Sequence, residues 1–294
     1  MANISAGMVK ELRERTGLGM MDCKKALEGA DGDMEKAIDD LRKASGVKAD
    51  KKSSRIANQG IVMTRIADQG DYGVLVEVNS ETDFAARDDN FLSFAKKVLD
   101  QAFTNREADV ASLLAGGIEA ARQALVQKIG ENINVRRVER LQFDNPNEGI
   151  VESYVHSTNR IAVLLALKGG DESLARDIAM HIAAMSPMVV RAEDVPKEVL
   201  AKESEIYSAQ ARETGKDKSE QIIEKMISGR LRKFVAEVSL LDQKFVKDPE
   251  KKVSDLLQEA GADVVSFVRF EVGEGIEKEE VDFAAEVAAQ VKGL

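Results

Sequence analysis

The sequence contains no tryptophan, four prolines, two histidines and a single cysteine in 294 residues. One cysteine, Cys23, cannot form an internal disulfide, and such sparing use suits the reducing cytosol, so we expect a cytoplasmic protein. No apolar run reaches the ~18 residues that a membrane-spanning helix needs. The N-terminus alternates charged and apolar residues, unlike a signal peptide. We therefore expect no association with a membrane.

Positive charge is also in deficit, with 52 acidic against 42 basic residues and a net charge of −10. This balance argues against an RNA-binding adaptor, because proteins that bind phosphate backbones present excess Lys and Arg. We expect no direct contact with nucleic acid and a protein as the partner. In the segment at 48–55 the positive charges are interpreted as a solvated tether, because no aromatic residues are interleaved with them.

Signatures of chemical catalysis are missing as well. We find no P-loop and no nucleophile elbow. The histidines, His156 and His181, have no cysteine or paired carboxylate at metal-ligand spacing, and His181 is expected to pack inside a helix of alanines and methionines. The segment Gly273-Glu274-Gly275 lacks the lysine and third glycine of a phosphate-binding loop. The sequence predicts no catalytic residue, no cofactor and no metal, and therefore a protein that is not an enzyme.

What the chain does contain is an internal repeat. Displaced by 89 residues (149 minus 60), the sequence matches itself without gaps over positions 58–95. The identical pairs are Asn58/Asn147, Gly60/Gly149, Ile61/Ile150, Val62/Val151, Val74/Val163, Leu75/Leu164, Ala86/Ala175, Arg87/Arg176, Asp88/Asp177 and Ala95/Ala184. Each copy has the pattern of a β-hairpin followed by a helix, the latter expected at about 88–104 and 172–185. We predict two related α/β units rather than a solenoid.

The two copies differ most at the junction between strand and helix. Here Glu81-Thr82-Asp83-Phe84 faces Gly170-Asp171-Glu172-Ser173. Phe84 lies seven residues before Phe91, so one interpretation places both on the buried face of a single helix. A fold that required an aromatic at this position should require it in both copies, which favours an added, exposed feature. The helix start is ambiguous, since several residues could cap it: Thr82, Asp83, Asp88 and Asn90.

The segment Thr82-Asp83-Phe84-Ala85-Ala86-Arg87 resembles the Thr-Asp-Phe-Val-Ala-Lys signature of bacterial translation elongation factor Ts, the nucleotide-exchange factor for elongation factor Tu. The resemblance extends to residues 9–17, 19–27 and 270–277, and thus to both ends of the chain. Alanine for valine and arginine for lysine keep the apolar and basic character. The resemblance implies a chain that binds elongation factor Tu with GDP and inserts Phe84 near the switch helices. Mg²⁺ would be displaced and GDP released, with Thr82, Asp83, Phe84 and Ala85 forming this site.

The resemblance also implies further contacts with elongation factor Tu. Arg13, Met20 and Met21 match a surface that grips its nucleotide-binding domain. The residues that match contacts to its third domain are Ile129, Gly130 and His156. The residues alone leave alternatives open. At least one methionine could belong to a helical core, Gly130 is also expected as a helix C-cap, and His156 could be a hydrogen-bonded hairpin residue.

The fold class expected is α+β, with a duplicated α/β core built on antiparallel sheets. Residues 187–240 show helical stripes without a strand signal, and we predict a helical hairpin, a coiled-coil arm. The resemblance implies that this arm serves self-association, as a homodimer or in a 2:2 complex, or contacts the partner. The expected domains are a three-helix domain of the ubiquitin-associated (UBA) type at 1–48, a linker at 49–55, core unit 1 at 56–139, core unit 2 at 140–186 and 241–272, the arm at 187–240, and a C-terminal module with a helix at 273–294.

Overall fold

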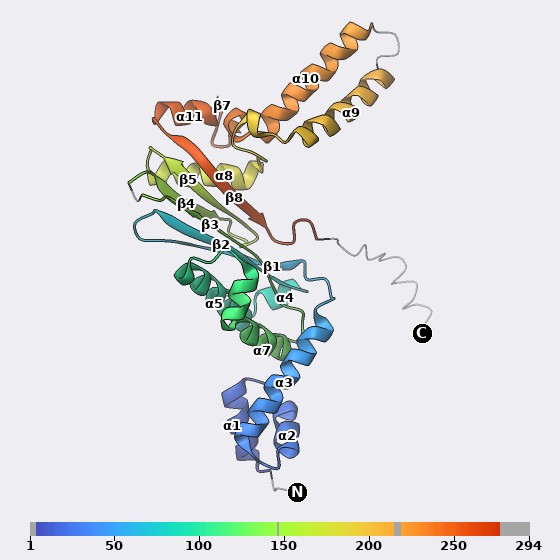
Figure 1. The fold of residues 1–294 in the computed structure, drawn as a ribbon, viewed down its shortest axis with the longest axis vertical. Helices are drawn as coiled ribbons and strands as arrows, with labels where there is room; N and C mark the ends of the chain where they lie inside the picture. Colours follow the sequence, from blue (N-terminus) through green and yellow to red (C-terminus); the bar gives the residue numbers. More distant parts are fainter. Residues whose placement is uncertain (1–3, 146, 215–218, 277–294) are drawn as a thin grey trace.

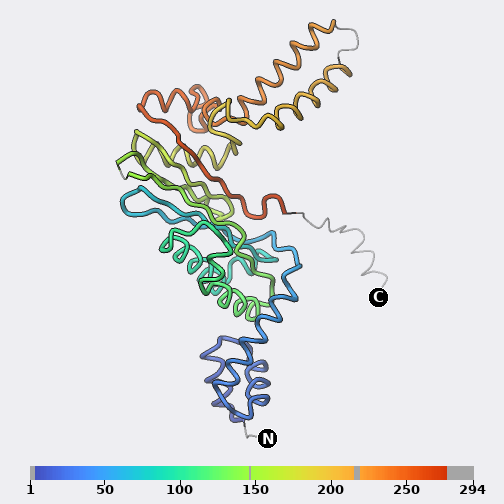
Figure 2. The backbone as a smooth tube through the Cα atoms, in the orientation of Figure 1, coloured from blue at the N-terminus to red at the C-terminus, as the bar shows by residue number. Residues whose placement is uncertain are grey.

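The computed structural model describes residues 4–145, 147–214 and 219–276, and these form an elongated α+β molecule (Figure 1). Two three-stranded antiparallel sheets lie at its centre. A three-helix unit occupies the N-terminal end, and a helical hairpin projects from the opposite end (Figure 2). The C-terminal helix predicted within 273–294 falls outside the described residues. No helix in the described part of the chain is long and apolar enough to cross a membrane.

The N-terminal unit consists of α1 (Ala6–Thr16), α2 (Met20–Gly29) and α3 (Met34–Lys52). Leu12, Cys23 and Leu27 are fully buried at its centre. The last turns of α3 leave this small core and pack against the main body. Residues 49–52 are therefore helical, and the linker predicted at 49–55 includes the last turn of α3. The charged sequence lacks an apolar period, yet Ala49 alone is buried in the core of the first unit and continues the helix into it.

Core unit 1 contains one sheet, in the order β1-β2-β3, covered by helices. Its elements are β1 (Gln59–Ile66), β2 (Tyr72–Ser80), α4 (Asp83–Ala86), α5 (Asp89–Asn105), α6 (Val110–Leu113), the π-turn Leu114–Ile118, α7 (Glu119–Ile129) and β3 (Asn134–Gln142). The apolar stripe of α5, which includes Phe91, Phe94 and Val98, is buried on the sheet. Strand β3 pairs with β2 as far as Gln142. A unit boundary at 139/140 would cut this strand, so the first unit ends later than predicted.

Core unit 2 repeats this plan with an interruption, and its sheet has the order β4-β5-β8. Its elements are β4 (Ile150–Val155), β5 (Ile161–Lys168), α8 (Glu172–Met185) and β8 (Asp263–Glu271). The arm, α9 (Lys197–Thr214) and α10 (Glu220–Val238), lies between α8 and β8. Sequence analysis missed a short hairpin, β6 (Lys244–Phe245) and β7 (Asp248–Lys252), and α11 (Val253–Glu259). These elements pack on α8 through Phe245, Val253 and Leu257.

The backbone confirms the repeat. In unit 1 the register shifts between Glu77 and Val78, and in unit 2 it shifts between Ala166 and Leu167, each pair displaced by 89 residues (166 minus 77). Gly60 has φ +140°, and a Cβ there would collide with the carbonyl oxygen of Val78. A Cβ at the equivalent Gly149 would likewise collide with the carbonyl oxygen of Leu167. The two sheets face each other across a shared apolar layer formed by Val62, Leu75, Ala162, Leu164, Phe270 and Val272.

Candidate functional site

Phe84 projects from α4, a four-residue helix between strand β2 and helix α5. Thr82 caps α4 through a hydrogen bond from the Ala85 N–H, 3.2 Å. Asp88 caps α5 through the Asn90 N–H, 2.8 Å. Two of the candidate caps are thus used, one for each of two separate helices.

The break between α4 and α5 decides where Phe84 points. Its side chain is 80% exposed, whereas Phe91 is fully buried. The two rings do not share a helix face, because the chain turns at Arg87 before α5 begins. The interpretation of Phe84 as a core residue is therefore wrong, and the repeat-based expectation of an exposed ring is confirmed. Ala85 and Ala86 are the residues of α4 that pack inward.

The surface around Phe84 carries charge from both core units. Asp83 forms an ion pair with Arg87, with 2.8 Å between Oδ2 and Nη2. A hollow beside α4 is lined by Asp83 and Arg87 of unit 1 and by Thr158, Asn159 and Arg160 from the β4–β5 turn of unit 2. This turn is tied to β1 by the hydrogen bond from the Val62 N–H to the Asn159 carbonyl, 2.9 Å. The Phe84 surface is thus built where the two units meet.

Two carboxylates hold α4 from behind. Glu131, which follows α7, accepts hydrogen bonds from the N–H and the hydroxyl of Thr82, at 2.9 and 2.7 Å. Glu81 accepts one from the N–H of Asn132, 2.6 Å. Sequence analysis did not single out Glu131, and no local pattern marks it, because its partner lies 49 positions away.

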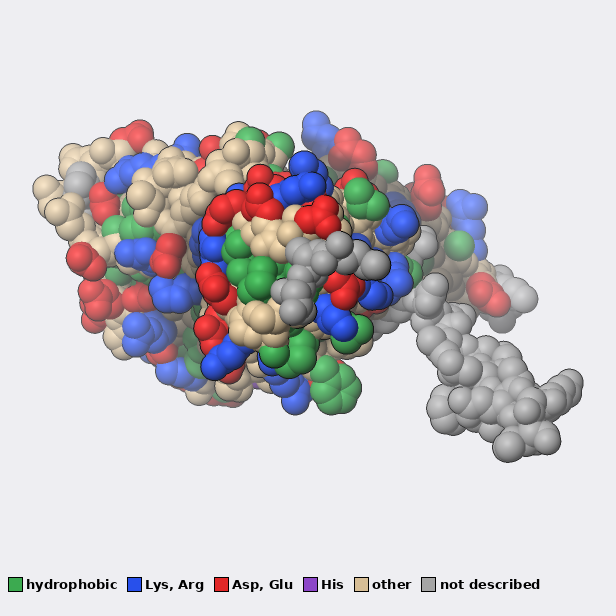
Figure 3. Space-filling view, turned by 90° about the horizontal axis from the view of Figure 1, so that it is seen from below, with side chains coloured by type: hydrophobic (Ala, Val, Ile, Leu, Met, Phe, Trp, Pro, Cys, Tyr) green, Lys and Arg blue, Asp and Glu red, His purple; other side chains and the backbone are tan. Residues whose placement is uncertain are grey.

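A second exposed apolar feature lies on the N-terminal unit. Met20 and Met21 open α2 and are 58% and 63% exposed. They line a surface hollow together with Arg13, Lys10 and Lys24. Figure 3 looks onto this end of the molecule and shows hydrophobic side chains ringed by charged ones. Neither methionine belongs to the three-helix core, so that alternative is wrong.

The other residues singled out from the sequence have local explanations. Gly130 ends α7 with φ +89°, a conformation that favours glycine. Ile129 packs half-buried against the first core. His156 lies exposed in the β4–β5 turn, with Nδ1 3.0 Å from the Thr158 hydroxyl. These three positions lie far from Phe84 in the sequence. His156 belongs to the same turn as Thr158, which lines the hollow beside α4.

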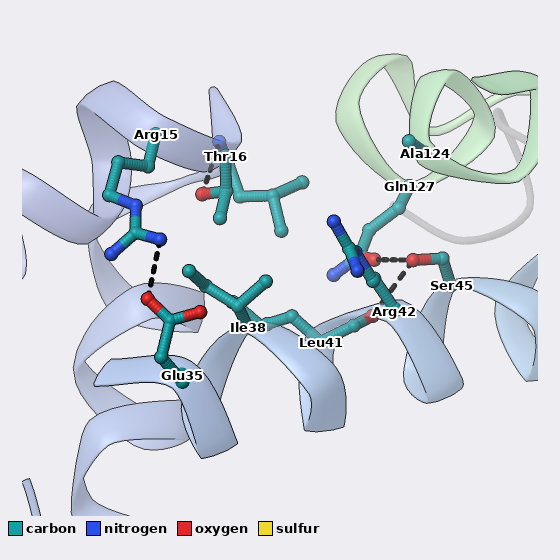
Figure 4. A pocket seen from close by; sticks show the side chains of 10 residues that line it. Arg15, Thr16, Glu35, Ile38, Leu41, Arg42, Ser45, Ala124 and Gln127 are labelled. Atoms are coloured by element: carbon teal, nitrogen blue, oxygen red, sulfur yellow. Dashed lines mark hydrogen bonds and ion pairs between the residues drawn. The ribbon is translucent and has the colours of Figure 1, made fainter. Parts of the chain in front are cut away.

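The junction between the N-terminal unit and the core contains a pocket lined by polar contacts (Figure 4). A pocket of about 300 Å³ separates the first helices from α7. On one side Arg15 and Glu35 are joined at 2.7 Å, and on the other the Ser45 hydroxyl of α3 lies 2.7 Å from the Gln127 side-chain oxygen of α7. Polar contacts and the buried end of α3 therefore place the methionine surface relative to the core.

Titratable groups do not assemble into a reaction centre in the part of the chain that the structure describes. No three or more His, Cys, Asp or Glu side chains there could hold a metal ion. His181 is fully buried, as expected for a packing residue. Burial lowers its pKa, although the hydrogen bond to Gln243 opposes this. The Val246 N–H donates to Nδ1, so Nε2 carries the proton that faces Gln243.

Comparisons with known proteins agree over the whole chain. Residues 81–274 match the family model described as Elongation factor TS. Elongation factor Ts of Hahella chejuensis is 62% identical over 293 residues, which cover 100% of both chains. That of Teredinibacter turnerae is 60% identical over 98% of this chain and 97% of its own, and that of Pseudomonas aeruginosa is 54% identical over 99% and 98%. The chain belongs to the elongation factor Ts family.

Proposed function

We propose that this chain is the guanine-nucleotide exchange factor for elongation factor Tu in translation elongation. It binds the GDP-bound partner, inserts Phe84 near its switch helices, displaces Mg²⁺ and thereby releases GDP. Family membership supports the partner and the overall role. The observation that carries the mechanism is the 80% exposure of Phe84 on a short helix whose N-terminus is capped by Thr82.

The exposed ring is suited to insertion between two helices of another protein. A phenylalanine in water gains free energy when it enters an apolar gap between helices, about 1.5–3 kcal/mol. Asp83 brings a carboxylate next to the ring and competes for groups that hold the partner's Mg²⁺. Once this cation is displaced, the diphosphate loses its largest compensating charge. Thr82 contributes by capping α4, and Ala85 by packing inward and anchoring the helix that carries the ring.

The ring alone does not supply enough energy. Weakening nucleotide binding a thousandfold requires about 4 kcal/mol of coupling. The remainder must come from contacts that favour the nucleotide-free shape of the partner. We assign these to the surface around Arg13, Met20 and Met21, and to a second surface around Ile129, Gly130 and His156. Because the coupling is reciprocal, nucleotide binding must equally weaken binding of the factor, so turnover needs no covalent step.

The domain roles follow from this assignment. The three-helix unit acts as a UBA-type binding domain on the nucleotide-binding domain of the partner. The hairpin of α9 and α10 acts as a coiled-coil arm, either between two copies of the chain or against elongation factor Tu. No cofactor takes part, and the partner is a protein.

The test is release of labelled GDP from elongation factor Tu after rapid mixing with an excess of unlabelled nucleotide. Phe84→Ala is expected to lower the release rate at saturating factor about 10- to 100-fold, the equivalent of losing the ring's burial. Formation of the nucleotide-free complex should weaken far less. Val246→Ala removes an exposed apolar side chain on core unit 2 and serves as the matched control. Equal release rates for wild type and Phe84→Ala would remove Phe84 from the mechanism.

A further inference from the structure

The N-terminal end of α4 is held by a reciprocal set of hydrogen bonds, which we call the clasp and define as Glu81, Thr82, Glu131 and Asn132. Both carboxylate oxygens of Glu131 are used, one by the Thr82 N–H and one by the Thr82 hydroxyl. In the opposite direction, the Asn132 N–H donates to Glu81. Two chain segments about 50 positions apart thus bind each other through backbone N–H groups and carboxylates.

The clasp orients the hydroxyl of Thr82, and this hydroxyl caps α4. The Thr82 hydroxyl donates to Glu131, which leaves its lone pairs to accept from the Ala85 N–H, 3.2 Å. A helix of only four residues has no stability of its own and depends on its cap and its neighbours. The direction of the Phe84 side chain therefore depends on a hydroxyl whose orientation Glu131 determines.

The clasp is also continuous with the stem of the N-terminal unit. Asn132 is buried, and its side-chain amide donates to the carbonyl of Arg55, 2.8 Å. Arg55 forms an ion pair with Glu81, 3.5 Å. The ammonium of Lys52, the last residue of α3, donates to the carbonyl of Gly130. Residues 130–132 thus hold the end of α3 on one side and the start of α4 on the other.

We infer that Glu131 is a positioning residue for Phe84, which it orients through the Thr82 cap without contacting the partner itself. This inference rests on the proposed role of Phe84. Charge-assisted hydrogen bonds to both carboxylate oxygens are stronger than neutral ones and confine the geometry of the group they hold. Loss of the carboxylate releases α4, so the ring meets its target in the productive direction less often.

The experiment uses Glu131→Ala and Glu131→Gln in the full chain, each with and without Phe84→Ala. The alanine variant is expected to lower GDP release at saturating factor about tenfold, and the glutamine variant about threefold because it keeps one acceptor. The factor concentration at half-maximal rate should change less than about twofold. In the Phe84→Ala background neither variant should slow release further, since both act through the same ring.

A second readout follows α4 without the partner. Amide hydrogen exchange at Ala85 in the free chain should be accelerated about tenfold or more by Glu131→Ala, and less by Glu131→Gln. Glu107→Ala is the matched control, because Glu107, like Glu131, accepts two hydrogen bonds, in its case from the backbone N–H groups of Ala108 and Asp109. It should change neither the rate nor the protection of Ala85.

The outcomes separate this inference from the proposed function. Unchanged protection of Ala85 would overturn the clasp, whatever the release rates. Equal slowing by Glu131→Ala with and without Phe84 would also overturn it, because Glu131 would then act independently of the ring. If Phe84→Ala alone releases GDP at the wild-type rate while Ala85 still loses protection, the proposed function fails and the clasp stands. If the alanine variant does not fold, the glutamine variant decides both readouts.

Discussion

Thr64 and Ser153 are hydrogen-bonded to each other between the two sheets, with 3.1 Å between their hydroxyl oxygens, and they are 89 positions apart. This separation is the period of the internal repeat, so the two residues occupy equivalent places in units 1 and 2. The β1–β4 contact therefore joins equivalent strands of the two units.

This contact predicts energetic coupling between the units. Thr64→Val and Ser153→Ala should each lower the free energy of unfolding by about 1 kcal/mol. Each substitution removes one hydroxyl and leaves the other, half-buried hydroxyl without its hydrogen-bond partner. The double variant should cost less than the sum, by about 0.5 kcal/mol or more. Denaturant unfolding of all four proteins measures the difference, and strict additivity would show that the hydrogen bond contributes nothing.

The methionine surface should affect binding rather than stability. Replacing Met20 and Met21 together by glutamine should raise the factor concentration at half-maximal GDP release about tenfold, because exposed apolar area is lost from the interface. The free energy of unfolding should change by less than about 0.5 kcal/mol, as is usual for exposed positions. Leu12→Ala is the contrasting variant, since it empties the three-helix core and should cost about 2–5 kcal/mol. A double methionine variant as unstable as Leu12→Ala would contradict this assignment.

Glu77 should make the fold sensitive to acid. Burial alone would raise its pKa, but hydrogen bonds from the Gly273 N–H and Asn79, together with the Arg137 charge, more than offset burial and lower it. A depressed pKa in the folded state adds stability above the ordinary value near 4.5, and this stability is lost as pH falls through the folded value. Glu77→Gln should cost about 2–3 kcal/mol at neutral pH, because it leaves Arg136 and Arg137 without their carboxylate.

The measurement for Glu77 is the free energy of unfolding as a function of pH. The difference between wild type and Glu77→Gln should shrink on acidification below about 4.5, as the wild-type carboxyl takes up a proton. Glu250→Gln, an exposed carboxylate on β7, is the control. A difference that stays constant down to about pH 3 would show that the charge of Glu77 is not the source of the effect.

His181 should add a second pH dependence at a higher range. Its pKa is lowered by burial, so the folded state holds it neutral. The unfolded chain binds the proton more readily, and stability must fall as pH drops below the ordinary value near 6.5. His181→Gln keeps a polar group near Gln243 but cannot titrate in this range, so its destabilisation should be larger at about pH 8 than at about pH 5.5. Calorimetry at both pH values, with wild type alongside, tests the sign.

Much of the fold was accessible from the sequence because it depends on local patterns. The period of 89 residues, the strands of both hairpins and the helices at 89–105 and 172–185 follow from spacing of apolar residues and from caps such as Asp88. The errors arose where a long-range contact overrides the local pattern. Ala49 keeps a charged segment helical by packing on the core, and the pairing of β3 with β2 moves a boundary that no residue marks.

The candidate site also combines residues that the sequence identified with residues that only the structure revealed. The comparison of the two copies showed that Phe84 is not required by the shared fold, and its exposure confirmed this. The residues that hold α4, Glu131 above all, had no sequence signal, since their partners are about 50 positions away.

The sequence by itself thus determined the repeat, the secondary structure of each copy and the aromatic residue at the strand–helix junction that the second copy lacks, because periodicity and capping act over a few residues. Only the tertiary structure decided how the copies meet, where the arm and the N-terminal unit leave the core, and which side chains fix the direction of Phe84. These features depend on hydrogen bonds and burial between distant segments, and such contacts exist only after the chain has folded.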